Sequence, residues 1–147
     1  MAKTGPLIII EDDQEDRELL QQALTEIGIK HTLKFFSSAE QALEYLMVTQ
    51  EQPFLILTDL NLPGMDGLAF QQVFQQSAYL RSKCIPLIFF STTDSPMIIK
   101  EAYTNILQGF FQKPSTFIGL KLTLLSITDY WERCLHPNSQ VLHKYTS

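Results

Sequence analysis

The sequence predicts an α/β fold in which a parallel sheet of five strands carries helices on both faces. Two observations lead to this prediction. Short apolar runs alternate along the chain with segments of helical periodicity, and the loops between them are short. A strand covered on both faces reads as a continuously apolar run, and parallel neighbours need long crossover connections such as helices. The 147 residues fit one domain of this kind.

Five segments are expected to form the strands. Four are continuously apolar and are expected to be buried on both faces, whereas the fifth mixes polar and apolar residues and suits an edge of the sheet. The apolar segments are residues 7–10, 54–57, 87–90 and 109–111, and the mixed segment is residues 31–37.

The intervals between these strands carry apolar side chains at the three- and four-residue spacing of amphipathic helices. Capping residues mark the helix limits, because a capping side chain accepts a hydrogen bond from a free N–H group of the first turn. In chain order, the predicted helix starts are Asp13, Ser38 with Gln41, Asp66-Gly67, Ser95-Pro96, and Ser115 or Thr116. Gly28 is predicted to end the first helix, and Pro137 the last.

Composition and charge exclude several classes of function. The net charge of −5 and the scattered basic residues argue against a surface for nucleic acids or anionic membranes. The longest apolar stretch, residues 85–90, is too short to cross a bilayer. The apolar run at residues 7–10 is too short for a signal peptide. We therefore expect a soluble cytoplasmic protein without a nucleic-acid or membrane partner.

The cysteines and histidines do not predict a metal site. Cys84 and Cys134 lack the paired spacing of zinc ligands and are too few for a disulfide framework. Both are expected to be half-buried free thiols in a reducing compartment. His31, His136 and His143 form no ligand pattern either, and we expect them at the surface or in the C-terminal tail.

Polar residues stand directly after four of the predicted strands. In an open parallel sheet, ligands bind beyond the carboxyl ends of the strands, where the strand order reverses. The first strand is followed by Glu11 and Asp12, the third by Asp59, the fourth by Ser91 and the fifth by Lys113. If the strand order is 2-1-3-4-5, the first and third strands are neighbours, and their three carboxylates lie close together.

Three carboxylates at one edge repel each other, and a proton or a cation must relieve that repulsion. Oxygen donors without His or Cys indicate a hard ion, and an open site completed by water suits Mg²⁺. Lys113 and Ser91 would face the carboxylates and, with the ion, neutralise the oxygens of a phosphoryl group during transfer to a carboxylate. Each residue alone is more often a helix-terminus charge or a cap, so the prediction rests on their combination.

At these residues the chain resembles the receiver domain of bacterial two-component systems. The resemblance covers about residues 6–135 and rests on four motifs, which read IIEDD, LTDLNLPGMDG, FFST and FQKP. It implies a flavodoxin-like, doubly wound sheet of order 2-1-3-4-5. It also implies a receiver domain over residues 1–137, a short tail over residues 138–147 and no output domain.

Residues 130–137 resemble a particular subgroup of receivers. Tyr130-Trp131 and Leu135-His136-Pro137 are similar to the end of stand-alone receivers that partner phytochrome-type or hybrid sensor kinases. Trp131 can equally be read as an anchor that packs the last helix. Homodimerisation is left open, and it depends on whether the apolar face of the last helix exceeds what the sheet covers.

The resemblance assigns the chemistry of the predicted site. Asp59 is implied to accept a phosphoryl group from a histidine of a kinase. Asp12 and Asp59 are implied to bind Mg²⁺ directly, the backbone carbonyl of Asn61 to add a ligand, and Glu11 to act through water. Lys113 is implied to pair with Asp59 or with its phosphoryl group.

The resemblance also assigns a conformational switch. Ser91 is implied to be the hydroxyl that moves to bind the phosphoryl group, and Phe110 matches the family's switch aromatic. For Phe110, a plain core position in the strand is an equally good explanation. The peptide bond between Lys113 and Pro114 is expected to be cis, which is costly unless it is selected.

The chain departs from the family pattern around the predicted switch. Thr92 stands where a small residue usually follows the switch hydroxyl, and residues 105–108 lack the usual small side chains before the fifth strand. Gln112 is polar where an aliphatic residue is usual. These positions lie on the surface that receivers use for signalling, so they leave the downstream partner and the size of the switch open.

The expected function is two-component phosphorelay signalling. The partners would be a sensor histidine kinase or a histidine phosphotransfer protein and an unidentified downstream protein. Beyond its own phosphorylation and dephosphorylation, the chain is not expected to be an enzyme. One alternative is a degenerate receiver that binds its partner without phosphorylation. The other is a phosphohydrolase of the haloacid-dehalogenase type, which needs a second Asp where Asn61 stands.

Overall fold

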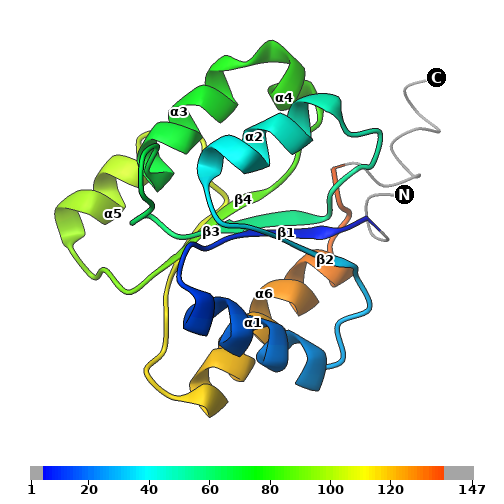
Figure 1. Cartoon of the computed structure of the whole chain (residues 1–147), viewed down its shortest axis with the longest axis vertical. Helices are drawn as coiled ribbons and strands as arrows, with labels where there is room; N and C mark the ends of the chain where they lie inside the picture. The colour runs from blue at the N-terminus through cyan, green and yellow to red at the C-terminus, as the bar shows by residue number, and fades with distance from the viewer. Residues whose placement is uncertain (1–4, 138–147) are drawn as a thin grey trace.

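The computed structural model describes residues 5–137 of the chain. Within this range the strands form one parallel sheet in the order β2-β1-β3-β4-β5, as the resemblance implied (Figure 1). The bounds are β1 Leu7–Ile10, β2 Leu33–Phe36, β3 Leu55–Thr58, β4 Leu87–Ser91 and β5 Gly109–Gln112. The mixed segment forms β2 at an edge of the sheet, which confirms its predicted place.

Helices cover both faces of this sheet (Figure 1). One face carries α1 (Gln14–Glu26) and α6 (Phe117–Arg133), and the other carries α2 (Ala39–Val48), α3 (Gly67–Gln76), α4 (Ala78–Ser82) and α5 (Pro96–Tyr103). The strand β1 shows why apolar runs predicted this arrangement. Its Leu7 and Ile9 pack into the core beneath α1 and α6, and Ile8 and Ile10 pack into the core beneath α2 and α3. None of the helices described in residues 5–137 is long and apolar enough to span a membrane.

Capping side chains begin the helices where they were predicted. Each accepts a hydrogen bond from a backbone N–H of the first turn: Asp13 from Glu15 (2.8 Å), Ser38 from Gln41 (3.2 Å), Asp66 from Ala69 (2.8 Å), Ser95 from Ile98 (3.5 Å) and Thr116 from Gly119 (3.0 Å). The short helix α4 was not predicted, because five residues are too few to show helical periodicity. The last helix ends at Arg133, before the predicted Pro137.

Two histidines contradict the prediction that they lie at the surface. The exposed fraction is 8% for His31 and 0% for His136. The ring of His31 stacks on Phe54, and its Nδ1 lies 2.8 Å from the carbonyl oxygen of Gly5. The Nε2 of His136 lies 2.7 Å from the carbonyl oxygen of Phe54. The rings can be buried because a backbone carbonyl at the amino-terminal edge of the sheet satisfies one nitrogen of each ring, and the carboxylate of Glu132 satisfies Nε2 of His31. His143 lies outside the described residues.

The two cysteines are free thiols, as expected. Cys134 is half-buried, but Cys84 is exposed, contrary to the prediction. Cys84 has a φ angle of 51°, in the left-handed region that side chains other than glycine rarely adopt. It lies in the tight turn between α4 and β4, and this turn leaves its side chain at the surface.

His136→Ala is expected to lower the free energy of unfolding by about 1–3 kcal/mol, because the carbonyl oxygen of Phe54 loses its donor inside the protein. Urea unfolding followed by circular dichroism measures the change. Leu135→Ala is the matched control, since Leu135 is 75% exposed and its truncation should cost less than about 0.5 kcal/mol. Equal losses in the two variants would contradict this role of His136.

Candidate functional site

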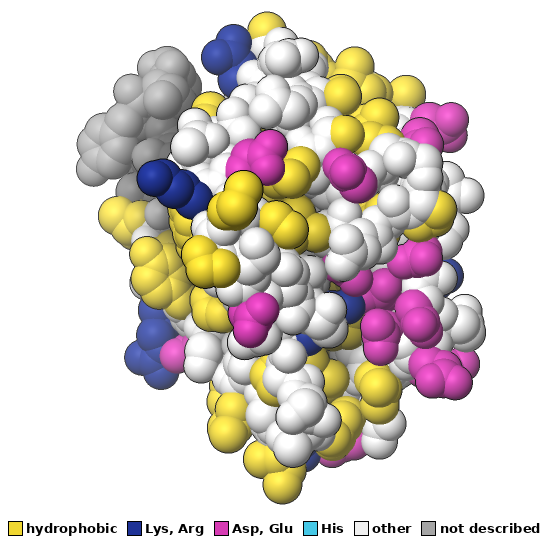
Figure 2. Space-filling model, turned by 90° about the vertical axis from the view of Figure 1, so that its left-hand side faces the viewer, with side chains coloured by type: hydrophobic (Ala, Val, Ile, Leu, Met, Phe, Trp, Pro, Cys, Tyr) yellow, Lys and Arg dark blue, Asp and Glu magenta, His cyan; other side chains and the backbone are white. Residues whose placement is uncertain are grey.

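The register of β1 and β3 brings the predicted carboxylates together. Ile10 and Thr58 are partners in the two parallel strands, so Glu11 and Asp59 follow at the same edge. The backbone N–H of Asp59 also donates to the carbonyl oxygen of Ile10 at 3.1 Å, which continues the pairing one residue past β3. Figure 2 looks onto this edge and shows acidic side chains gathered on it.

Lys113 joins these carboxylates. Its Nζ lies 2.5 Å from Oε1 of Glu11 and 3.0 Å from Oδ2 of Asp59. Its backbone N–H donates to the carbonyl oxygen of Ser91 at 2.7 Å, which fixes the end of β5 against β4. A third carboxylate, Asp16 on α1, lies 3.6 Å from Nζ. Sequence reasoning missed Asp16, and the only signal for it was its acidic character in the first turn of α1.

The ion cluster of Glu11, Asp59 and Lys113 is largely buried. The side chains of Glu11, Lys113 and Asp59 are 2%, 11% and 12% exposed. Burial raises the pKa of Glu11, and its hydrogen bond to Lys113 opposes this only in part. Burial alone would lower the pKa of Lys113, but the hydrogen bond to Glu11 and the charge of Asp59 outweigh it and raise that pKa. Lys113 is therefore a cation at neutral pH, held between two carboxylates.

The other predicted site residues lie around this cluster. Asn61 donates its backbone N–H to Oδ1 of Asp59 at 3.2 Å. Ser91 is fully buried at the end of β4, and its Oγ accepts the backbone N–H of Thr93 at 3.4 Å. Asp12 follows Glu11 and is exposed, and within residues 5–137 no hydrogen bond or ion pair of its carboxylate is found. The structure thus brings Glu11, Asp59 and Lys113 into contact, with Asn61 bound to Asp59.

The donors at this edge fit a hard ion that keeps several waters. Glu11, Asp12, Asp59 and the Asn61 carbonyl would offer only oxygen atoms, which is the chemistry that Mg²⁺ prefers. Among the described residues, no three Asp, Glu, His or Cys side chains are grouped closely enough to hold a metal ion. An ion here would therefore depend on a backbone carbonyl and on water for its remaining ligands.

Gly67 keeps the loop after β3 close to the sheet. Its N–H donates to the carbonyl oxygen of Leu60 at 2.8 Å. A Cβ atom on Gly67 would lie 2.7 Å from the carbonyl oxygen of Asp59 and 2.7 Å from Cα of Leu60. No real side chain tolerates such a distance to backbone atoms. The sequence showed Asp66-Gly67 as a helix start, but only the folded structure brings Gly67 against the backbone of Asp59.

Three details concern the predicted switch. Phe110 is half-buried and lies edge-on to the buried ring of Phe89, with centroids 5.9 Å apart, so its switching stays a prediction. Gln112 is exposed, and its Nε2 donates to the carbonyl oxygen of Thr92 at 3.4 Å. The prediction of a cis bond between Lys113 and Pro114 is wrong, since every peptide bond in residues 5–137 is trans. The trans isomer is the default for X–Pro bonds, and here Lys113 reaches both carboxylates with it.

Comparison with known proteins shows the family of this chain. Residues 7–124 match the family described as the response regulator receiver domain. The chain is 28% identical over 129 residues to the probable methanogenesis regulatory protein FilR2 of Methanothrix harundinacea, covering 85% of this chain and 82% of that protein. It is 31% identical over 106 residues to the DNA-binding transcriptional regulator NtrC of Klebsiella pneumoniae, covering 72% of this chain but only 21% of NtrC.

A solved structure shows the same fold. The phosphorylated cyanobacterial phytochrome response regulator RcpA superimposes with a TM-score of 0.80 at 23% identity, covering 90% of this chain and 98% of RcpA. The family match spans more than half of the chain and includes all five strands. The chain therefore belongs to the response regulator receiver domain family.

Proposed function

We propose that this receiver accepts a phosphoryl group on Asp59 from a phosphohistidine of a sensor kinase or a histidine phosphotransfer protein. The contact of Lys113 with both Asp59 and Glu11 carries this proposal, because it sets a buried cation beside the carboxylate that directly follows β3. In the transfer, a carboxylate oxygen of Asp59 forms a bond to phosphorus as the bond from phosphorus to the donor's imidazole nitrogen breaks. The imidazole leaves with the electron pair.

The chain's own groups are arranged to stabilise that transfer. Lys113 neutralises negative charge on the phosphoryl oxygens, and its backbone bond to Ser91 keeps the cation at the end of the sheet. The N–H of Asn61 holds Oδ1 of Asp59, so Oδ2 is the oxygen that faces Lys113. A Mg²⁺ ion held by Asp12, Asp59 and the Asn61 carbonyl, with Glu11 acting through water, would neutralise further phosphoryl charge.

The output would be a change in protein contacts near β4 and β5. We propose that Ser91 turns to the new phosphoryl oxygens, and that Phe110, which already packs against Phe89 and Ala102, then turns further inward into the space that Ser91 vacates. A local charge change would thereby bias a two-state element, which is how receivers can act without catalysis of their own. The predicted tail, residues 138–147, lies outside the described residues, so the division of the chain stays a prediction.

A second copy of the chain is one candidate partner. On α6, Ile118, Leu122, Leu125 and Tyr130 are all exposed, although the opposite side of the helix packs on the core. An apolar face of this kind is typical of interaction surfaces. If it forms a homodimer, Leu122→Glu should shift the protein to the monomer in analytical ultracentrifugation. If the wild-type chain is already a monomer, the homodimer is refuted, and the exposed face of α6 is then a candidate binding surface for the downstream protein.

Beryllofluoride, which mimics a phosphoryl group on a carboxylate, tests the proposed site. With Mg²⁺ and beryllofluoride together, we expect a saturable complex that shifts the NMR amide resonances of Asn61 and Ser91. Asp59→Asn should abolish the complex, whereas Glu44→Gln, which removes an exposed carboxylate from α2, should bind as the wild type does. Binding by Asp59→Asn, or none by the wild type, would refute the role of Asp59.

The two alternatives gain no support from the site. A phosphohydrolase of the haloacid-dehalogenase type needs a carboxylate two residues after its nucleophile, and Asn61 stands there. A degenerate receiver would not need a buried lysine against its acceptor carboxylate. Partner binding that survives Asp59→Ala unchanged would nevertheless favour the degenerate receiver.

A further inference from the structure

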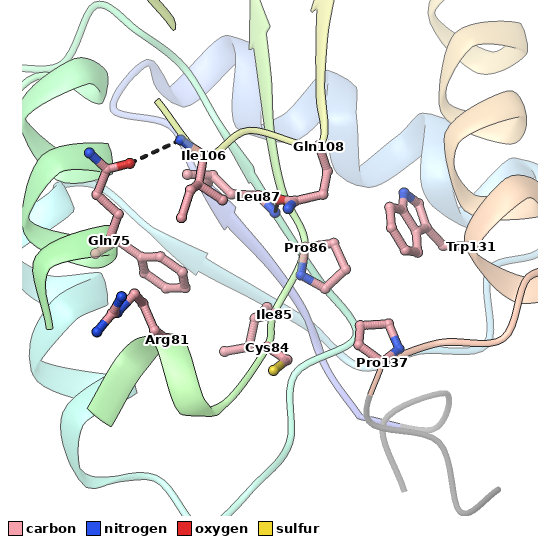
Figure 3. Close-up of a pocket in the computed structure, with 11 residues that line it drawn as sticks. Gln75, Arg81, Cys84, Ile85, Pro86, Leu87, Ile106, Gln108, Trp131 and Pro137 are labelled. Carbon is pink, nitrogen blue, oxygen red and sulfur yellow. Dashed lines mark hydrogen bonds between the residues drawn. The ribbon is translucent and has the colours of Figure 1, made fainter. Parts of the chain in front are cut away.

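A cavity of about 360 Å³ lies at the amino-terminal ends of β4 and β5, the edge of the sheet opposite Asp59. Residues 84–87 form its floor, α3 and α4 contribute one wall, and Trp131 of α6 stands on the other side (Figure 3). Its volume is in the range of sites for small organic molecules, roughly 300–1,000 Å³. The proposed phosphoryl transfer uses none of its residues.

The lining of this cavity is mostly apolar. Its apolar side chains include Phe74, Ile85, Pro86, Leu87, Ile106 and Trp131. Its two amide side chains are committed to the walls: Oε1 of Gln75 accepts the N–H of Ile106 at 3.0 Å, and Oε1 of Gln108 accepts the N–H of Leu87 at 2.7 Å (Figure 3). These bonds hold the cavity in shape, so an occupant would meet mainly apolar surface.

Arg81 supplies the charge of this cavity. It is the one charged residue among those that line it, it comes from α4, and it is exposed. No ion pair within residues 5–137 involves its guanidinium, whereas Lys34, Lys113, Lys121 and Arg133 all have carboxylate partners. A guanidinium is the side chain best suited to a carboxylate, because it can donate two parallel hydrogen bonds to it.

We propose that this cavity binds a small amphipathic carboxylate, such as a medium-chain fatty acid. The apolar body lies between Ile106 and Trp131, over Pro86 and Leu87, and the carboxylate pairs with Arg81. The apolar lining provides affinity by removing hydrocarbon from water, and Arg81 selects for a negative head group over a neutral or positive one.

Trp131 allows a direct test, because it is the single tryptophan of the chain and it lines the cavity. Decanoate, kept below the concentration at which it forms micelles, is titrated into the wild-type protein while tryptophan fluorescence is recorded. We expect a saturable change. Decanol and decylamine should bind about tenfold more weakly, because neither offers Arg81 an anionic acceptor for two parallel hydrogen bonds. Equal affinity for the three compounds, or a change that does not saturate, would overturn the proposal.

Two variants separate the charge of Arg81 from general electrostatics. Arg81→Gln should weaken decanoate binding by about tenfold without changing the fluorescence of the free protein. Lys100→Gln, which removes an exposed positive charge from α5 outside the cavity, should bind as the wild type does. Unchanged binding by Arg81→Gln would refute the assigned head-group contact.

NMR then locates the bound decanoate, since Trp131 also adjoins a second hollow lined by Ile88, Phe111 and Tyr130. We expect the largest amide shifts at Ile85, Leu87 and Ile106, which line the cavity and not the second hollow. Shifts centred on Phe111 and Tyr130 instead would place the ligand in the second hollow and overturn the proposal.

Discussion

Lys113→Ala is expected to lower the free energy of unfolding by about 3 kcal/mol, because it leaves two buried carboxylates without their cation. Glu11 and Asp59 are 2% and 12% exposed, and burial, with a smaller contribution from the charge of Asp59, already raises the pKa of Glu11. Without Lys113, Glu11 must take up a proton or bear the repulsion. Urea unfolding at neutral pH measures the loss. A change below about 1 kcal/mol, the value typical of surface pairs, would contradict the strength assigned to this cluster.

Lys34→Ala is the matched control for this variant. Lys34 and Glu51 also form an ion pair, at 3.0 Å, but their side chains are 34% and 49% exposed. Solvent screens such a pair, so its loss should cost only about 0.2–1 kcal/mol. The difference between the two variants therefore reports burial together with the number of carboxylates that each lysine contacts, which is three for Lys113 and one for Lys34.

The effect of Lys113→Ala should also depend on pH. The pKa of Lys113 is raised above its ordinary value of 10.5 in the folded protein, so its contribution to stability is fully present below about pH 10.5. That contribution is lost as the pH rises through the higher folded pKa. The stability gap between wild type and variant should thus persist at neutral pH and narrow in strong alkali.

In function, we expect the Lys113→Ala variant to accept some phosphoryl group on Asp59 but to fail to pass the resulting conformational change to β4 and β5.

Gly67→Ala is expected to lower the free energy of unfolding by about 1–3 kcal/mol and to slow phosphorylation of Asp59. The added Cβ would lie 2.7 Å from the carbonyl oxygen of Asp59 and from Cα of Leu60, so the loop that carries the acceptor must move. A displacement of that size takes Asp59 away from Lys113, and reactions at a positioned group are sensitive to such shifts. Unfolding in urea and the rate of phosphoryl gain from acetyl phosphate give the two readouts.

Gly28→Ala separates these two effects. Gly28 has a φ angle of +80°, so alanine there is strained, but nothing lies within 4 Å of the added Cβ. It ends α1 at the opposite edge of the sheet from Asp59. Both variants should therefore lose stability, and only Gly67→Ala should phosphorylate more slowly. Equal rates in the two variants would show that Gly67 does not position Asp59.

The fold was predictable because its elements have strong local signals. A strand such as β1 buries alternate side chains on both faces of the sheet, so its run of four apolar residues is unambiguous. Capping residues such as Ser38 and Asp66 act within one turn, and their effect can be read from neighbouring positions. The short α4 and the earlier end of α6 had no comparable signal.

The contacts of the site were predictable where the sheet creates them. The approach of Glu11 to Asp59 follows from the strand order, because β1 and β3 are parallel neighbours whose ends lie at one edge. Lys113 follows β5 at the same edge, two strands from β3, and its long side chain reaches both carboxylates. The contact of Asp16 with Lys113 depends on the direction of α1, which the sequence does not give. The burial of His136 depends on its contact with the carbonyl oxygen of Phe54, 82 residues away in the chain, and no sequence pattern shows such a contact. The metal ligands and the switching of Ser91 and Phe110 stay predictions.

Intact-mass spectrometry after incubation with acetyl phosphate tests the proposed acceptor most directly. The wild-type chain, Asp59→Asn and Glu44→Gln are compared, each with Mg²⁺ and with a chelator. With Mg²⁺ we predict a gain of one phosphoryl group by the wild type and by Glu44→Gln, and no gain by Asp59→Asn or in the presence of the chelator. A phosphoryl group gained by Asp59→Asn, or gained equally without Mg²⁺, would contradict the assignment of Asp59 as a metal-dependent phosphoryl acceptor.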